Sequence, residues 1–238
     1  MSLKFFNRKI NTQRGSVFFY IFIAIVLIAA LTYSVSNNSR TNTSILTDQQ
    51  AKIAAQNIIE QGETVSNTVQ KLLLRGYRET EISFENNIAT GYTLAECVEN
   101  GCKVFDINGG GLNWIYPPEY ANEGENWIYT GTVPVRYNGK NPVYDITAIL
   151  PNIDEKVCQE INFKLGLAAT NNEDILSSAD TTIYINRLHT GSPINPTANY
   201  LDGPNIDGNP SICISIDSMT GHYTGTNQNY YVHTLYAG

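Results

Sequence analysis

The chain has 238 residues and a formal charge of −7, enough for one medium-sized domain with or without an appended segment. Four basic residues are the only charges among the first fifteen, and without them the formal charge becomes −11: Lys4, Arg8, Lys9 and Arg14. Such an acidic body repels nucleic acid, because phosphate binding needs Lys and Arg. We therefore expect no nucleic-acid partner.

Residues 16–39 contain no charged side chain, and Val17 to Leu31 are apolar apart from the hydroxyl of Tyr20. About twenty helical residues, at about 1.5 Å each, cover the roughly 30 Å hydrocarbon core of a bilayer. Basic residues precede this run, whereas Arg40 is the only one in the next stretch of similar length. The bias predicts a transmembrane helix over 16–39, with a cytoplasmic N-terminus and the rest of the chain across the membrane.

The residues alone are compatible with three interpretations of this hydrophobic run. It can remain as an uncleaved anchor of an extracytoplasmic binding or adhesion protein. It can be a signal peptide, because Ser34-Val35-Ser36 is an acceptable small-x-small site for ordinary signal peptidase and would release a secreted protein. It can also be a segment whose basic leader, residues 1–15, is trimmed while the helix is kept.

A second, amphipathic helix is expected within residues 40–76. Thr47 to Gln50 fits a capping box at a helix N-terminus. Gly62 weakens the middle of this helix, and Gly76 marks its expected end. Apolar residues recur largely at steps of three and four, as in a helix that covers a sheet: Ala51, Ala54, Ile58, Val65, Val69, Leu72 and Leu73.

From residue 77 onward, short β-prone runs alternate with Gly, Pro and Asn. The best strand candidates are residues 126–137, 142–150, 181–188, 211–217 and 229–236. Residues 154–166 predict a short helix that ends at Gly166, and residues 190–211 predict a long exposed loop. A long N-terminal helix followed by a mainly antiparallel sheet is an α+β fold, with residues 77–238 as its β-rich globular domain.

The four cysteines all lie beyond the hydrophobic run, which agrees with export to an oxidising compartment. Cys97 and Cys102 flank a four-residue loop with an Asn-Gly pair, and such a loop can turn a hairpin. The preferred pairing is therefore Cys97 with Cys102 and Cys158 with Cys213, out of three possible pairings. The spacing is a poor match to a zinc site.

The second bridge has a geometric requirement. Three isoleucines alternate with Cys213 in residues 211–217, so a strand there would turn the cysteine away from its apolar face. Cys158 would then have to come from an element packed on the opposite side of the sheet.

The sequence contains few of the patterns that are typical of an enzyme. The sequence has no Gly-x-Ser-x-Gly elbow, phosphate-cradling Gly-rich loop or His-Glu-x-x-His motif. His189, His222 and His233 are scattered and are interpreted as surface or structural residues, and Gly109 to Gly111 as a turn. We therefore expect a protein without enzymatic activity.

Calcium is the one cofactor that we consider, because calcium takes six to eight hard oxygen ligands. Four candidate ligands share a short Gly/Pro-rich loop whose spacing does not fit an EF-hand: Asp202, Asn205, Asp207 and Asn209. The alternative is that Asp-Gly and Asn-Pro simply make turns there.

The N-terminal pattern resembles a type IV prepilin, a family that includes minor pilins and the pseudopilins of type II secretion. The resemblance lies in a basic leader ending in Arg14-Gly15, the uncharged helix after it, the amphipathic continuation and the cysteine-bearing sheet domain. It is specific over residues 8–35 and architectural over the rest. Some pseudopilins resembling this chain bind calcium in their C-terminal loops.

The resemblance implies that prepilin peptidase cleaves between Gly15 and Ser16 and usually methylates the new N-terminus. It implies other pilin or pseudopilin subunits, an inner-membrane assembly platform and its ATPase as partners. The precursor would lie in a bacterial inner membrane with its C-terminal domain in the periplasm, and then enter an extracytoplasmic filament.

Position 20 departs from the family pattern. The family usually has glutamate at the fifth mature position, where its carboxylate is thought to offset the positive N-terminus inside the bundle; here that residue is Tyr20. A lone carboxylate in a membrane span costs roughly 2.5–3.5 kcal/mol, so a protein that keeps one has a use for it. Its absence, shared with tip pseudopilins, implies a minor subunit.

Overall fold

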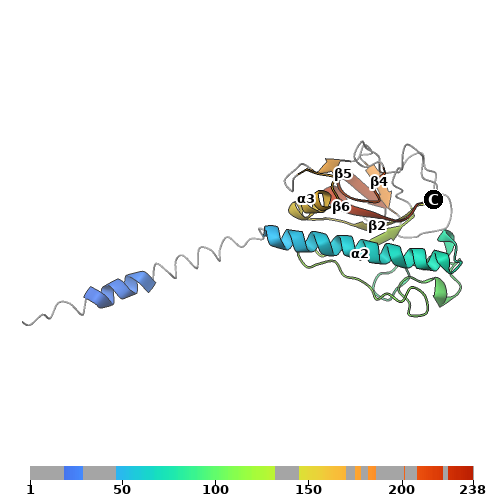
Figure 1. Cartoon of the computed structure of the whole chain (residues 1–238), viewed down its shortest axis with the longest axis horizontal. Coiled ribbons are helices and arrows are strands. Elements are labelled where there is room, and N and C mark those ends of the chain that lie inside the picture. The colour runs from blue at the N-terminus through green and yellow to red at the C-terminus, as the bar shows by residue number, and fades with distance from the viewer. Residues whose placement is uncertain are drawn as a thin grey trace, which may run out of the picture. The chain divides into compact units, whose positions relative to one another are not determined.

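The computed structural model describes residues 19–28, 47–131, 145–169, 175–177, 182–185, 201, 208–221 and 225–237. The chain divides into two compact units, residues 1–45 and 46–238. Residues 19–28 of the first unit are helical. The second unit is α+β (Figure 1), as the sequence predicts.

The long helix of the second unit, α2, spans Asp48–Leu74. The capping box is present: Gln50 N–H donates to the Thr47 hydroxyl, and Thr47 N–H donates to Gln50 Oε1. The predicted apolar stripe is buried, apart from Leu73, which is partly buried against the core. The amphipathic helix expected over 40–76 thus runs from 48 to 74, and residues 40–46 lie outside the described residues.

Helices α2 and α3 both end shortly before a glycine, for the same reason. After α2, Gly76 has φ +98°, and its N–H and that of Tyr77 donate to carbonyls of the last helical turn. After α3, which spans Glu155–Lys164 and is capped by Asp154, Gly166 has φ +73° and the same arrangement. This C-terminal motif needs a left-handed residue, which favours glycine. Both predicted helix ends are confirmed.

The sheet order is β1-β2-β6-β5-β3, and β4 also pairs with β5. Neighbouring strands are antiparallel from β1 to β5, whereas β3 and β4 pair parallel with β5, so the sheet is mainly antiparallel. The strands are β1 Ile128–Thr130, β2 Ile146–Leu150, β3 Leu176–Ser177, β4 Thr182–Ile185, β5 Ser211–Gly221 and β6 Gly225–Tyr236. Two short 3₁₀ helices precede them, η1 Glu79–Glu81 and η2 Asn100–Cys102.

Each of the five predicted strands overlaps an observed one, but the bounds differ. Within 126–137 the described strand is Ile128–Thr130, and within 142–150 it is Ile146–Leu150; residues 132–137 and 142–144 lie outside the described residues. The last two extend further than predicted, to Gly221 and from Gly225. The two-residue strand β3 was not predicted. Most of the expected loop 190–211 lies outside the described residues.

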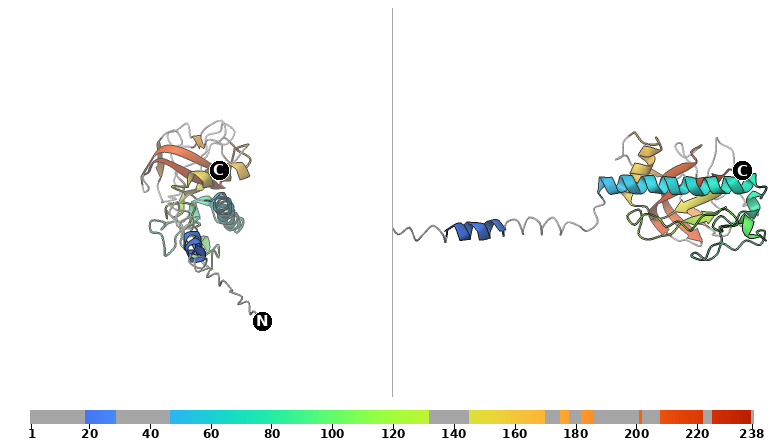
Figure 2. Two further views of the ribbon diagram at one scale, coloured as in Figure 1. Left: turned by 90° about the vertical axis from the view of Figure 1, so that its left-hand side faces the viewer. Right: turned by 60° about the horizontal axis from the view of Figure 1, so that its bottom comes forward.

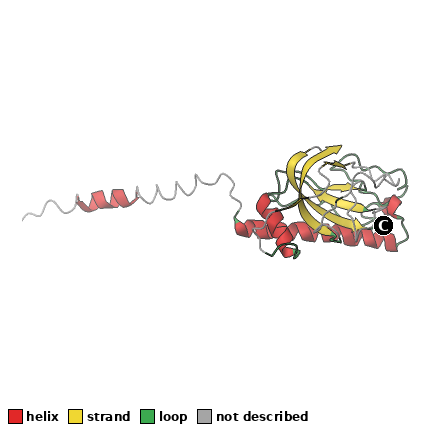
Figure 3. Cartoon of the chain, turned by 90° about the horizontal axis from the view of Figure 1, so that it is seen from above, coloured by secondary structure: helices red, strands yellow, loops and turns green. Residues whose placement is uncertain are grey.

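Both faces of the sheet are buried, by different groups of side chains. One face packs against α2 and α3, which also contact each other (Figures 2 and 3). The other face carries a separate apolar cluster. It consists of Ile128, Ile149, Leu201, Ile212, Ile214, Ile216, Tyr230 and Val232. The alternation in β5 therefore divides its isoleucines from Cys213, which joins the helix-side core.

Helix α3 is bonded to β5 at Cys213. The Cys158–Cys213 disulfide links the two elements, and both cysteines are fully buried. The Asn162 carboxamide also donates to the Cys213 carbonyl at 2.7 Å and accepts from its N–H at 3.0 Å. Cys158 thus comes from an element on the side opposite the isoleucines, as the strand pattern requires.

We expect Asn162→Ala to destabilise the protein, because the buried N–H and carbonyl of Cys213 both lose their partner. Leaving buried polar groups unpaired costs about 1–3 kcal/mol each, so the expected loss is at least about 2 kcal/mol. Chemical unfolding with the disulfides intact measures it. Asn67→Ala, at an exposed position of α2, is the matched control and should change stability by less than about 0.5 kcal/mol. Equal unfolding midpoints for the two variants would contradict the assigned role of Asn162.

Candidate functional site

The helical stretch 19–28 is the candidate assembly segment. Every large apolar side chain in it is exposed within the chain, from 41 % for Ile23 to 70 % for Phe22. A helix that is apolar on all sides is normally buried in a protein core or in a membrane. A helix of this composition is expected to have lipid or other helices around it.

Tyr20 lies in the first turn of this helical stretch and is 67 % exposed. Its phenol can donate and accept a hydrogen bond. The helix 19–28 contains no carboxylate side chain.

Part of the predicted processing and membrane region lies outside the described residues. Gly15 and Ser16 are among these, as is most of the run 16–39. Among the residues that the structure describes, no helix has both the length and the apolar character needed to cross a bilayer.

Three of the four candidate calcium ligands, Asp202, Asn205 and Asp207, also lie outside the described residues; Asn209 alone is described and is partly buried. The described part of the chain contains no group of three or more His, Cys, Asp or Glu residues placed to hold a metal ion. The calcium site therefore stays a prediction from the sequence.

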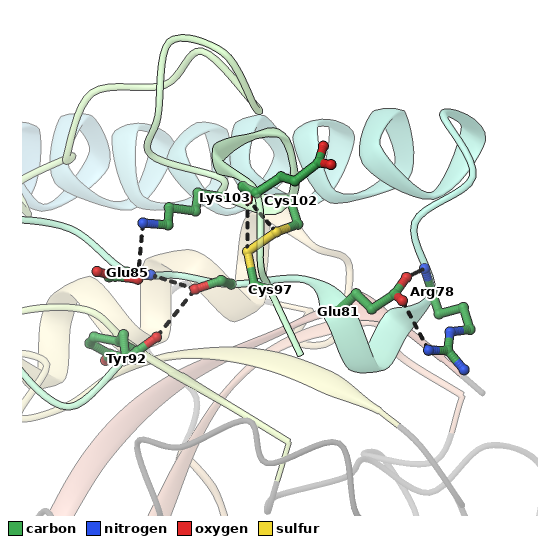
Figure 4. Close-up of a disulfide and its surroundings, with 9 residues drawn as sticks. Arg78, Glu81, Glu85, Tyr92, Cys97, Cys102 and Lys103 are labelled. Carbon is green, nitrogen blue, oxygen red and sulfur yellow. Dashed lines mark hydrogen bonds and ion pairs between the residues drawn. A yellow bond between two sulfur atoms is a disulfide. The ribbon is translucent and has the colours of Figure 1, made fainter. Parts of the chain in front are cut away.

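Both disulfides of the preferred pairing are present, Cys97–Cys102 and Cys158–Cys213. The hairpin expected between Cys97 and Cys102 is wrong, because this loop carries the 3₁₀ turn η2 instead (Figure 4). In this turn Cys102 N–H donates to the Glu99 carbonyl, and Lys103 N–H donates to the Asn100 carbonyl. Cysteines five positions apart can be bridged across such a turn, so the loop with the Asn-Gly pair does not need a strand on each side.

A buried polar cluster lies between the sheet and α2, and the sequence did not identify it. Ser211, Tyr231 and His233 form a closed triangle, in which the Ser211 hydroxyl is 2.6 Å from Tyr231 OH and 3.1 Å from His233 Nδ1. Tyr231 OH is 3.3 Å from the same ring nitrogen. The available signal was the two-residue alternation of β6, which puts Tyr231 and His233 on one face, but the partner strand was needed to add Ser211.

This triangle is structural. Its three side chains are at most 5 % exposed, so a substrate has no access to the Ser211–His233 pair. Gly62 of α2 packs directly on it, and a Cβ at that position would lie 3.1 Å from the His233 ring. Burial lowers the pKa of His233 to about 4, which keeps the imidazole neutral. Burial also raises the pKa of Tyr231.

The hollow beside α2 does not form a ligand pocket. It is lined by Gln61, Gly62, Val65, Ile115, Trp127, Tyr129 and Ala148, and it has no room for a water molecule. The polar groups at its rim are already paired, since Trp127 Nε1 donates to Gln61 Oε1 and Gln61 Nε2 donates to the Tyr116 carbonyl.

Comparison of the chain with models of protein families, with curated proteins and with solved structures found no match.

We expect acid to destabilise the domain through His233. Because its folded pKa of about 4 lies below the ordinary 6.5, the unfolded chain takes up this proton first as the pH falls. Stability is therefore unaffected above about pH 6.5, declines below it, and reaches its full loss of about 3 kcal/mol near pH 4. Chemical unfolding between pH 4 and 8 measures the slope.

His233→Gln should flatten this slope, because glutamine does not titrate. The decisive quantity is the difference in slope between wild type and variant, so a general loss of stability in the variant does not obscure it. Parallel curves over this pH range would contradict the assignment to His233.

Proposed function

We propose that this chain is a minor pilin or pseudopilin, a non-enzymatic subunit of a type IV pilus-like or type II secretion filament. The observation that carries the proposal is the helix over 19–28, which is apolar around its whole circumference and follows shortly after a basic leader that ends in Arg14-Gly15. A capped amphipathic helix and a disulfide-linked sheet domain follow it, in the order found in prepilins. The disulfides also support an extracytoplasmic location.

The proposed mechanism is mechanical. The precursor is inserted in the inner membrane with its N-terminus in the cytoplasm, and prepilin peptidase removes residues 1–15. The assembly platform and its ATPase then move the apolar helix out of lipid and into a bundle of neighbouring helices. Lipid and helix surfaces are similarly apolar, so association rests on side-chain packing more than on hydrophobic transfer. The sheet domain faces outward from the bundle.

The first test is the mature N-terminus. We expect mass spectrometry of the assembled or membrane-bound protein to find Ser16 as its first residue, because Arg14-Gly15 precedes the apolar helix. Gly15→Leu should block this cleavage and leave the precursor in the inner membrane. An N-terminus at Asn37 would instead indicate a secreted protein, and an intact Met1 a plain anchor; either result would refute the proposal.

We further propose that the chain is a minor subunit rather than the bulk filament protein. Inside a bundle each subunit buries a positive N-terminus, and an uncompensated buried charge costs several kcal/mol. Tyr20 can form a hydrogen bond but cannot neutralise that amine. Repeating the penalty along a filament disfavours a homopolymer, whereas a few copies at one end tolerate it.

The corresponding test expresses the chain with the assembly machinery but without other pilins. We expect no long filaments from the wild type by electron microscopy. Tyr20→Glu supplies the carboxylate and should restore them, and Tyr20→Phe is the matched control that should not. Long homopolymers of the wild type would defeat the assignment as a minor subunit without affecting the test of N-terminal processing.

A further inference from the structure

The two disulfides differ in their access to solvent. Cys158 and Cys213 are both fully buried between α3 and the sheet. By contrast, Cys97 is partly exposed, and the residues on both sides of it are exposed. A thiolate must reach a sulfur atom to exchange with a disulfide, so access decides which bridge reacts in the folded protein.

The two sulfurs of the exposed bridge are also unequal. Cys102 is 2 % exposed, and its backbone is fixed because its carbonyl accepts from Ser83 N–H at 3.0 Å. The chain enters the core immediately afterwards at Val104, which is fully buried and whose N–H donates to the Ser83 carbonyl. Figure 4 shows this bridge beside the paired side chains of Lys103 and Glu85. Cys97 is therefore the more exposed residue of the bridge, and Cys102 is held by the fold.

We propose that Cys97–Cys102 is a thiol–disulfide exchange site of the folded protein, used by an extracytoplasmic dithiol oxidoreductase. A thiolate of the dithiol attacks Cys97 Sγ and forms a mixed disulfide, while the electron pair of the protein's S–S bond passes to Cys102 Sγ. The Cys102 thiolate takes a proton from solvent. The second thiol of the dithiol then loses its proton and attacks the dithiol sulfur of the mixed disulfide, and Cys97 leaves as a thiolate that takes up a proton. The protein disulfide is thereby reduced and the dithiol is oxidised.

Opening this bridge leaves the core contacts in place. The hydrogen bonds between Ser83 and residues 102 and 104, and the bond from Arg75 Nη1 to the Gly109 carbonyl, do not include Cys97. Reduction therefore releases only the exposed loop around Val98, which is 89 % exposed. The buried bridge has no such route, because a thiol reaches it only after α3 separates from β5. Exchange at the exposed bridge is separate from filament assembly and does not depend on it.

The experiment treats the full-length protein, solubilised in detergent under native conditions, with dithiothreitol as the probe. Samples taken over time are alkylated and mapped by mass spectrometry, with circular dichroism recorded in parallel. We expect Cys97 and Cys102 to become alkylated at least about 100-fold faster than Cys158 and Cys213, with the folded signal unchanged, because the buried pair requires an opening of the domain. Equal rates for the two pairs, or loss of the folded signal together with the first alkylation, would overturn the proposal.

A second measurement tests the direction of attack. Reduced glutathione replaces dithiothreitol, and the reaction is quenched with acid before mapping. We expect glutathione on Cys97 and a free thiol at Cys102; glutathione on Cys102 would contradict the assignment of the attacked sulfur. The Cys97→Ser/Cys102→Ser double variant is the control, and it should keep the folded signal and show no alkylation on the fast timescale.

Discussion

The attachment of α3 to β5 at Cys213 is the constraint on which the rest of the domain depends. One covalent bond and two hydrogen bonds from Asn162 meet at this residue, which lies in a strand near the centre of the sheet. The buried carboxamide is tolerated because both of its polar ends are paired. Helix α3, fixed in this way, packs against α2, so the position of α3 determines how the two helices together cover the face of the sheet.

Close packing of α2 on that face requires a small residue where the sheet presents its polar side chains. Gly62 lies over the Ser211–Tyr231–His233 triangle, whose three side chains hydrogen-bond one another. A glycine within a helix costs up to about 1 kcal/mol relative to alanine. Here the close approach of helix and sheet offsets that cost. The same contact explains why His233 is neutral and structural.

The two units of the chain have different physical requirements. The second unit buries its apolar side chains in two clusters, on either side of one sheet. The helix 19–28 of the first unit buries almost none of its own. The second unit thus has a core of its own, whereas the helix 19–28 is apolar along its whole length. The two disulfides also differ in burial. Cys158–Cys213 lies inside the core, whereas Cys97–Cys102 reaches the surface at Cys97.

Local features of the sequence determined the helices and the strand positions. The capping box at Thr47, the stripe along α2 and the glycines at 76 and 166 act over a few residues, so sequence alone predicts them. The alternation around Cys213 likewise predicted which side of the strand its partner would come from. Strand bounds, the short parallel strand β3 and the 3₁₀ turn at Asn100–Cys102 depend on hydrogen bonds to distant segments, and only the tertiary structure decided them. The same holds for two contacts between distant residues. Asn162 and Cys213 are separated by 51 positions in the sequence, and Ser211 and His233 by 22, so each pair meets only when the sheet and helices have packed.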